Sequence, residues 1–220
     1  HFAIETDIEV IPNFVSHFNF KEKKNGSVVT RKKELAPNGE FIISHISNFR
    51  KLKRLHDVVS IFNLIHKKVP AKLILAGDGP ERFAAEQQCK ELGICKDVEF
   101  VGNVQSADEI LDISDLFLLP SETESFGLAA LEALASGVPV ISSNSGGLPE
   151  VNEQGVSGFL SKVGNVKEMA DNALKILATP ESLAKFRQQA YEHSLKFSLE
   201  SILPKYEALY DRVLKKKKEI

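Results

Sequence analysis

The chain has 220 residues, of which 43% are apolar and 26% are charged, a composition typical of water-soluble globular proteins. Its net charge of −2 gives no electrostatic reason to expect binding to nucleic acid or to an anionic membrane. The apolar runs fall far short of the roughly 20 residues that cross a bilayer, and no signal peptide is visible. We therefore expect a cytoplasmic protein that neither binds nucleic acid nor inserts stably into a membrane.

The start of the chain reads as polar or irregular. Residues 8–14 look like a strand that runs into a turn, as though the chain entered from a preceding domain. Residues 21–39 are rich in Lys, Asn, Ser and Gly, which predicts an exposed loop.

From residue 41 onward, strand and helix patterns alternate, which predicts a parallel sheet joined by crossover helices. Short runs typical of buried strands occur at 41–47, 72–76, 98–101, 116–119 and 138–142. Helical spacing predicts helices at 53–67, 80–92, 107–113, 126–136, 166–178, 181–191 and 200–216. The predicted fold class is α/β, a Rossmann-like doubly wound parallel sheet with flanking helices.

Metal chemistry finds no support in the sequence. Cys89 and Cys95 have too few ligand candidates around them for a zinc site, so we interpret them as free thiols. The six histidines show no metal-ligand spacing. His45 falls within or beside a predicted buried strand, where a hydrogen-bonded core residue is expected rather than a catalyst.

Polar residues follow each predicted strand, and ligands bind at the carboxyl edge of an open parallel sheet. The loops 47–54, 77–80, 102–104, 121–124 and 144–150 bring cations, glycines and carboxylates to this edge. Arg50 and Lys53 lie at a helix start, where cations oppose the helix dipole unless an anion binds. They form either a diphosphate clamp or a solvated basic turn. Gly146 and Gly147 allow close approach to a ligand, although a plain loop is the alternative.

The segment 120–132 carries the strongest signal. Glu124 and Glu132 lie eight residues apart, one in a loop and one in a helix predicted to open near Phe126. At about 1.5 Å per residue the pair spans roughly 12 Å, the length of a nucleotide-sugar from hexose to ribose. The helix N-terminus between them suits a diphosphate. For Glu132, an ion pair within the protein or an exposed helix face is the alternative.

These residues resemble the retaining glycosyltransferases of family four. Glu124-x7-Glu132, with residues 125–128 inside it, is similar to the E-x7-E motif of that family. Segments 77–80, 98–102, 135–140 and 146–150 resemble other motifs of the same family. The resemblance implies the C-terminal half of a GT-B fold. Residues 1–15 would be a hinge segment from a missing N-terminal acceptor domain, 16–198 the donor-binding domain, and 199–220 a helix packing toward the missing domain.

By position, the resemblance gives catalytic roles to Glu124, which holds hydroxyls of the donor hexose, and to Lys53 with Arg50, which neutralise the departing diphosphate. It assigns donor binding to Asn48, Gly102, Asn103, Val104, Ser125, Phe126, Gly127, Leu128 and Glu132. In this set Glu132 holds the ribose, residues 102–104 contact the uracil, and main-chain N–H groups at 126–128 bind the β-phosphate or sugar.

One position departs from the family pattern. Many members carry Gly-Arg at the end of the first strand, with a Lys five residues after the Arg. Lys53 matches that Lys, but Asn48 stands where the Arg would be. Whether Arg50 or Asn48 completes the diphosphate clamp stays open.

The resemblance implies transfer of a hexosyl group from a UDP-sugar to a small acceptor with retention of configuration, without a cofactor or an obligatory metal. Segments 11–14 and 47–54 look most like the enzymes of bacillithiol biosynthesis that transfer N-acetylglucosamine from its UDP donor to L-malate. The expected partners are UDP-N-acetylglucosamine or another UDP-sugar and, through the missing domain, a small acceptor such as L-malate. This chain alone is expected to be inactive, and a homo-oligomer of the full-length protein stays open.

Two alternatives come from other classes. A flavodoxin-like nucleotide-binding or signalling module would need a phosphate- or flavin-binding loop after the first strand, and the charged run 50–54 lacks the Ser, Thr and Gly residues of such a loop. An epimerase of related fold would need acid/base carboxylates and a histidine, a set that is not found in this chain.

Overall fold

A six-stranded parallel sheet forms the centre of the computed structural model, which describes residues 8–16 and 26–218. The strand order is β3-β2-β1-β4-β5-β6. The strands are β1 (Phe41–Ile46), β2 (Ala71–Ala76), β3 (Val98–Gly102), β4 (Leu116–Leu119), β5 (Val140–Ser143) and β6 (Gly158–Ser161). The predicted doubly wound sheet is confirmed, with five of its strands within two residues of the expected bounds at either end.

The strand order reverses direction between β1 and β4, which pair side by side with Ile43 opposite Leu116. From β1 the chain moves outward through β2 to β3, then returns to β4 and proceeds to β6 on the other side. In open parallel sheets, ligands bind outside the carboxyl ends of the strands at such a reversal of strand order. The segments after these two strands carry Lys53 and Glu124.

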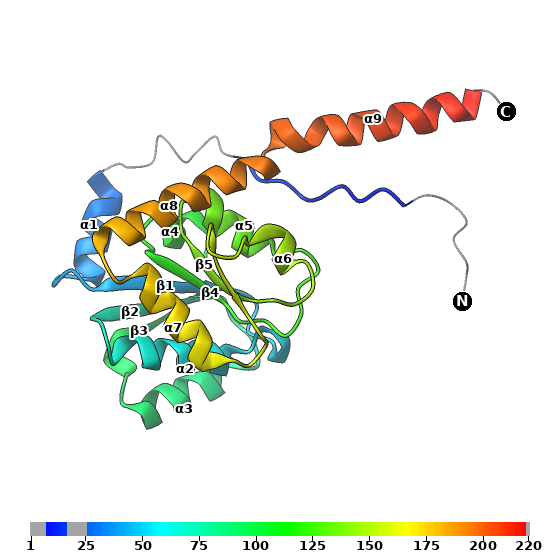
Figure 1. The fold of residues 1–220 in the computed structure, drawn as a ribbon. Helices are drawn as coiled ribbons and strands as arrows, with labels where there is room; N and C mark the ends of the chain where they lie inside the picture. Colours follow the sequence, from blue (N-terminus) through cyan, green and yellow to red (C-terminus); the bar gives the residue numbers. More distant parts are fainter. Residues whose placement is uncertain (1–7, 17–25, 219–220) are drawn as a thin grey trace.

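Helices cover both faces of the sheet (Figure 1). Alternate side chains of a strand point to opposite faces, so Ile43 packs with α2 (Leu55–His66), α3 (Arg82–Leu92) and α7 (Val166–Ile176). Phe117 belongs to the other face, with α5 (Leu128–Ala135), α6 (Leu148–Val151) and α8 (Pro180–Ser194). A smaller cluster on that face joins Ile42 to α1 (Gly26–Leu35) and α4 (Asp108–Leu111). Burial of both faces explains the nearly continuous apolar strands.

The prediction of an exposed loop over residues 21–39 is wrong for α1, while residues 21–25 lie outside the described part. The lysine-rich composition hid a narrow apolar stripe. Val28, Leu35 and the buried Ala36 pack against the cluster that contains Ile42. This tertiary contact stabilises a helix whose local propensity gives a weak signal.

The strand β6 and the short helix α6 were not predicted. At Gly158 an added Cβ would lie 1.8 Å from the carbonyl oxygen of Val140, so only glycine lets β6 approach β5. Glycine at a strand start looks like a turn signal in the sequence.

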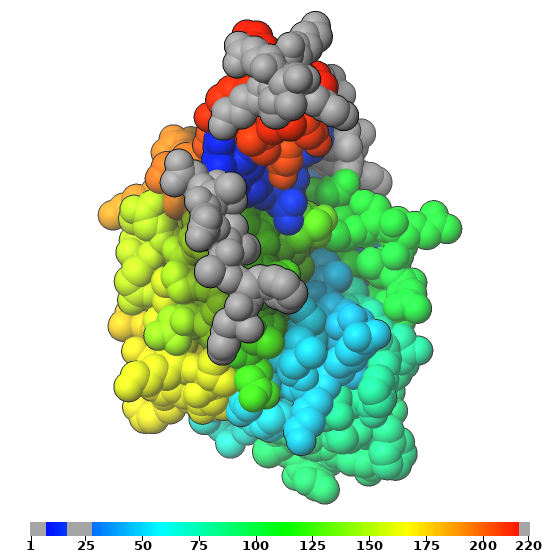
Figure 2. All heavy atoms as spheres, turned by 90° about the vertical axis from the view of Figure 1, so that its right-hand side faces the viewer, coloured from blue at the N-terminus to red at the C-terminus, as the bar shows by residue number. Residues whose placement is uncertain are grey.

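The strand expected over residues 8–14 does not form. Of residues 8–16, Val15 alone has ladder pairing, through an isolated parallel bridge to Ser198. The segment runs beside α9 (Leu199–Lys218), and Glu9 forms an ion pair with Arg212. Figure 1 shows both segments extending from the body of the domain, and Figure 2 shows them next to each other. Residues 1–7 and 219–220 of the predicted terminal segments lie outside the described part.

Exposed apolar side chains lie on this projection. Val10 and Ile8 are about three-quarters exposed, and α9 exposes Tyr210, Val213 and Leu214 by more than half. The three-part division at residues 15/16 and 198/199 stays a prediction. Within the described ranges, no helix combines the length and hydropathy needed to span a membrane.

Candidate functional site

The loops at the carboxyl edge of the sheet are joined by direct main-chain hydrogen bonds. The amide of Gly77 donates to Gly102 O at 2.7 Å, and that of Glu122 donates to Leu52 O at 2.7 Å. The amide of Gly147 donates to Glu124 O at 2.8 Å. The amide of Phe49 donates to Asp78 O at 2.9 Å, which joins the segment after β1 to the segment after β2. The segments at the carboxyl ends of β1 to β5 are therefore connected through main-chain hydrogen bonds.

Lys53 and Glu124 meet at the centre of this surface. Lys53 ends the 3-10 turn η1 (Lys51–Lys53), and its Nζ lies 2.5 Å from Glu124 Oε1. Ser121 Oγ donates to the same carboxylate oxygen at 2.8 Å. The side chains of Lys53 and Glu124 are only 17% and 13% exposed. Since water is mostly excluded, the two charges act on each other, and on a ligand, more strongly than a surface pair would.

Arg50 and Asn48 lie on the exposed rim beside this pair. Arg50 directly precedes η1 in an extended conformation, and its amide donates to Asn48 O at 2.7 Å. Both residues are exposed. The structure thus keeps both as candidates for the second half of an anion clamp.

Glu132 lies on α5 as predicted and is half-buried. Burial raises the pKa of its carboxyl group, and the nearby carboxylate of Asp108 raises it further. No ion pair joins Glu132 to a cation of the described residues, so the alternative of an internal salt bridge finds no support in that part of the chain. A desolvated carboxylate without a cation is suited to accept hydrogen bonds from ligand hydroxyls.

The helix α5 begins at Leu128, two residues later than predicted, because Gly127 adopts a left-handed conformation with φ of 97°. An added Cβ at Gly127 would lie 2.7 Å from Leu148 Cδ2. Ser125 and Phe126 therefore belong to the loop. The Phe126 ring packs edge-on against Phe197, with centroids 6.0 Å apart, so its position depends on the segment that follows α8. The helix start leaves main-chain N–H groups free of helical partners.

The predicted uracil loop follows β3. Gly102 has φ of 71° and its carbonyl oxygen accepts from Gly77, so that oxygen is already used. Asn103 is exposed, whereas Val104 is half-buried and packs against the cluster of Ile42 and Ile110. Asn103 is thus the member of this loop whose side chain reaches solvent.

The glycines at 146 and 147 make close contacts with the site loop itself. A Cβ on Gly146 would lie 1.9 Å from Glu124 O, and one on Gly147 would lie 2.6 Å from Ser125 O. Of the two alternatives given for this pair, the structure supports loop packing. Two serines that no sequence motif indicates also hold this loop: Ser143 Oγ donates to Ser121 O at 2.5 Å, and Ser145 Oγ donates to Glu122 O at 2.7 Å.

His45 is the buried core residue that was expected. It is fully buried, and both ring nitrogens lie within hydrogen-bonding distance of a partner. Burial lowers the pKa of His45 to about 4. Among the described residues, no cluster of three or more His, Cys, Asp or Glu side chains could hold a metal ion. Cys89 and Cys95 are free thiols.

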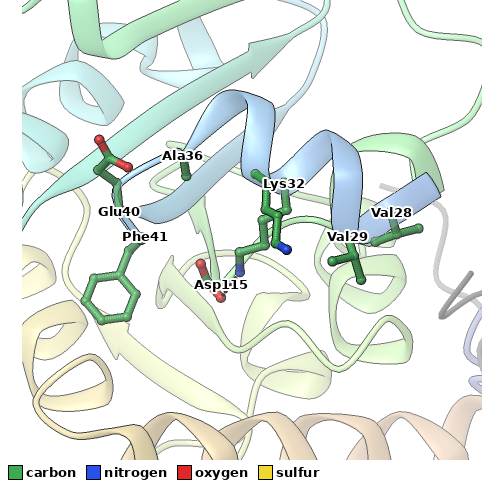
Figure 3. Close-up of a pocket in the computed structure, with 9 residues that line it drawn as sticks. Val28, Val29, Lys32, Ala36, Glu40, Phe41 and Asp115 are labelled. Carbon is green, nitrogen blue, oxygen red and sulfur yellow. Dashed lines mark hydrogen bonds and ion pairs between the residues drawn. The ribbon is translucent and has the colours of Figure 1, made fainter. Parts of the chain in front are cut away.

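A cavity of about 380 Å³ lies at the opposite, amino-terminal edge of the sheet (Figure 3). Its lining combines apolar residues of α1 with Lys32 and the buried carboxylate of Asp115. Asp115 is already paired, since its oxygens accept from Lys32 Nζ at 2.6 Å, Arg187 Nη1 at 3.1 Å and the amide of Ile42 at 2.9 Å. These contacts join α1, β1 and α8, which indicates a structural role for Asp115.

Residues 28–193 match the family model of the glycosyl transferases group 1. The chain belongs to this glycosyltransferase family, and its sheet with flanking helices is the Rossmann-like half of a GT-B fold. Over 211 residues, or 95% of the chain, it is 41% identical to the N-acetyl-alpha-D-glucosaminyl L-malate synthase of Bacillus anthracis. It is 34% identical over 63% of its length to the 2-deoxystreptamine N-acetyl-D-glucosaminyltransferase of Niallia circulans. The chain spans 55% and 36% of these two relatives.

Solved structures agree with the sequence relatives. Anabaena Alr3699/HepE, solved in complex with UDP, is 25% identical with a TM-score of 0.83, covering 93% of this chain and 57% of that one. S. aureus TarM, solved with fondaparinux, alpha-GlcNAc-glycerol and UDP, is 26% identical with a TM-score of 0.78, covering 93% of this chain and 40% of that one.

Proposed function

We propose that this chain is the donor-binding half of an enzyme that transfers N-acetylglucosamine from its UDP donor to a small acceptor such as L-malate, with retention of configuration. The observation that carries the proposal is the mostly buried Lys53–Glu124 pair at the point where the strand order reverses. Eight residues further on, Glu132 offers a half-buried carboxylate that no described cation neutralises. The two carboxylates flank the start of α5.

Each group then has a separate role. Lys53, with Arg50 or Asn48 on the rim, stabilises charge on the diphosphate as the bond to the sugar breaks. Glu124 accepts hydrogen bonds from hydroxyls of the hexose, and Glu132 accepts from the ribose. Main-chain N–H groups of Gly127 and Leu128 face the β-phosphate, and the loop with Asn103 contacts the uracil. Retention follows from attack on the face that the diphosphate leaves, with positioning as the main contribution of the protein. No obligatory metal is part of this proposal.

The choice of sugar and acceptor is supported by the relative from Bacillus anthracis, whose name specifies both groups. The acceptor site belongs to the part of such a protein that this chain does not span. The exposed apolar residues of segment 8–16 and α9 supply a surface on which that part can pack.

Calorimetry with UDP and UDP-N-acetylglucosamine at millimolar concentration tests the proposal. We expect weak binding of both ligands and no transfer to L-malate by the chain alone. Glu132→Gln is expected to lose UDP binding, while Glu91→Gln, a change of an exposed glutamate on α3, keeps it. No heat from the unmodified chain with either ligand contradicts the proposal.

A further inference from the structure

His45 and Ser47 form a hydrogen-bonded pair that has no role in the function described so far. His45 lies in β1 between the rings of Phe49 and Phe117, each with its centroid 6.4 Å away. Its Nδ1 lies 2.8 Å from Leu118 O, and its Nε2 lies 2.7 Å from Ser47 Oγ. The pair thus connects the buried sheet to the first residue after β1.

The hydrogen-bonding chemistry of Leu118 O, His45 and Ser47 determines which atom carries each proton. A carbonyl oxygen can only accept, so Nδ1 must carry the proton of the neutral ring. Nε2 then has no proton and accepts from the hydroxyl of Ser47. Since a hydroxyl has one proton, Ser47 has none left to donate to a ligand. Its oxygen is therefore held as an acceptor only.

Ser47 stands at the edge where the site lies. It is half-buried, and its own amide donates to Ala76 O at 3.1 Å. A Cβ on Gly77 would lie 1.8 Å from Ser47 O, so the neighbouring loop holds the residue closely. Leu118, whose carbonyl oxygen accepts from His45, lies three residues before Ser121, whose hydroxyl donates to Glu124. The His45–Ser47 pair and the Lys53–Glu124 pair therefore belong to the same two segments, the carboxyl ends of β1 and β4 with the loops that follow them. Besides burial, which lowers the pKa of His45 most, the charges of Lys53 and Glu124 also act on it.

An acceptor-only oxygen discriminates between the parts of a nucleotide-sugar. Ionised phosphate oxygens carry no proton and cannot donate to it, whereas sugar hydroxyls and an acetamido N–H can. Ser47 follows β1, as Lys53 does, and its partner His45 is also bonded to β4, the strand that leads to Glu124. Of the two ligand parts that the proposed function assigns to Lys53 and Glu124, only the hexose carries protons to donate. We propose that Ser47 accepts a hydrogen bond from a hydroxyl or amide of the transferred sugar, a proposal that rests on the function given above. His45 is then the positioning residue, because it holds the Ser47 hydroxyl as an acceptor.

The test compares two ligands that differ in the sugar. Calorimetry of the 220-residue chain gives the dissociation constants of UDP-N-acetylglucosamine and of UDP. Ser47→Ala is expected to weaken binding of the UDP-sugar about threefold to tenfold, the usual value of one hydrogen bond, and to leave UDP unchanged. An equal effect on both ligands, or no effect on the UDP-sugar, overturns the inference.

Two substitutions of His45 separate positioning from folding. His45→Asn places an amide N–H near the former Nδ1 and can keep the bond to Leu118 O, but it removes the acceptor for Ser47. His45→Gln reaches the former Nε2 and keeps an acceptor for Ser47. We expect His45→Asn to behave like Ser47→Ala, and His45→Gln to keep the preference for the sugar. Thermal unfolding shows whether both variants still fold cooperatively. If they do, and His45→Gln loses the preference for the UDP-sugar while His45→Asn keeps it, the proposed role of His45 is overturned. If the unmodified chain binds neither ligand, the proposed function fails and this inference fails with it.

Discussion

Lys53 and Glu124 neutralise each other through a 2.5 Å contact between Nζ and Oε1. They come from loops after two different strands, β1 and β4, and Ser121 supports the carboxylate at 2.8 Å. The proposed function gives them different partners, diphosphate for Lys53 and hexose for Glu124. A bound nucleotide-sugar must therefore divide or share this pair, which makes the two residues energetically coupled.

Removing the carboxylate should free the lysine. In Glu124→Gln we expect UDP to bind about threefold to tenfold more tightly, because Lys53 no longer has a competing anion and one charge-assisted contact is worth about 1 kcal/mol or more. UDP-N-acetylglucosamine should gain less, since it loses the hexose contact. Calorimetry with both ligands measures the difference. Glu122→Gln is the matched control, because Glu122 is an exposed residue of the same loop. Weaker binding of UDP by Glu124→Gln would show that the pair does not hold Lys53 back.

Glu132 should make the folded state less stable as the pH rises. Burial raises its pKa in the folded protein, so the stabilisation present below the unfolded value, about 4.3, is lost as pH rises through the folded value. Glu132→Gln removes this dependence. We expect a higher melting temperature than the parent at pH 7 and no gain at about pH 3.5. Thermal unfolding at the two pH values measures this, and a gain of equal size at both would argue against desolvation as the cause.

The Gly146→Ala substitution should be costly because it pushes into the site loop. The new Cβ would lie 1.9 Å from Glu124 O, and φ is 59°. Left-handed backbone alone costs alanine about 1–2 kcal/mol, and the collision adds to it. Gly155→Ala is the control, since Gly155 has φ of 75° and nothing within 4 Å of the added Cβ. Denaturant unfolding should show Gly146→Ala as the more destabilised variant, with UDP binding lost. Equal stability losses would mean that the loop moves aside freely.

Asp115 should matter for stability and not for ligand binding. Its side chain is 6% exposed and accepts from Lys32, Arg187 and the amide of Ile42. Breaking such a buried ionic cluster typically costs about 3 kcal/mol, so Asp115→Asn should lower the free energy of unfolding by that order. Asp171→Asn removes an exposed i,i+4 pair with Lys167 and should cost well under 1 kcal/mol. UDP affinity of the folded Asp115→Asn protein should match the parent, and a large loss of affinity would mean that the two sheet edges are coupled.

Helices and strands with a clear apolar pattern could be predicted from the sequence. Elements that depend on tertiary contacts could not. The buried strands β1, β2 and β4 are short runs made mostly of apolar residues, so their place in a parallel sheet could be inferred. The helix α1 could not, because its few apolar residues make sense only against Ile42. β6 was hidden for a similar reason, since Gly158 serves close strand packing and not a turn.

In the candidate site, too, some residues could be predicted from the sequence, whereas the contacts between them could not. Glu124, Lys53 and Glu132 follow from spacing and from the edge rule for parallel sheets, and the structure places the first two in contact. Spacing could not reveal that Lys53 and Glu124 form an ion pair with each other. Nor could it reveal that Ser143 and Ser145 hold the site loop, because these bonds join a hydroxyl to a distant carbonyl. His45 gave only a core signal, since its partner Leu118 lies on another strand.

A crystal structure of the chain with UDP would show where the nucleotide binds. We expect the ribose hydroxyls on the carboxylate of Glu132, the diphosphate at the start of α5 within reach of Lys53, and the uracil against the loop of Asn103. UDP bound at the amino-terminal edge, beside Asp115, or a ribose that does not contact Glu132, would contradict the proposed function.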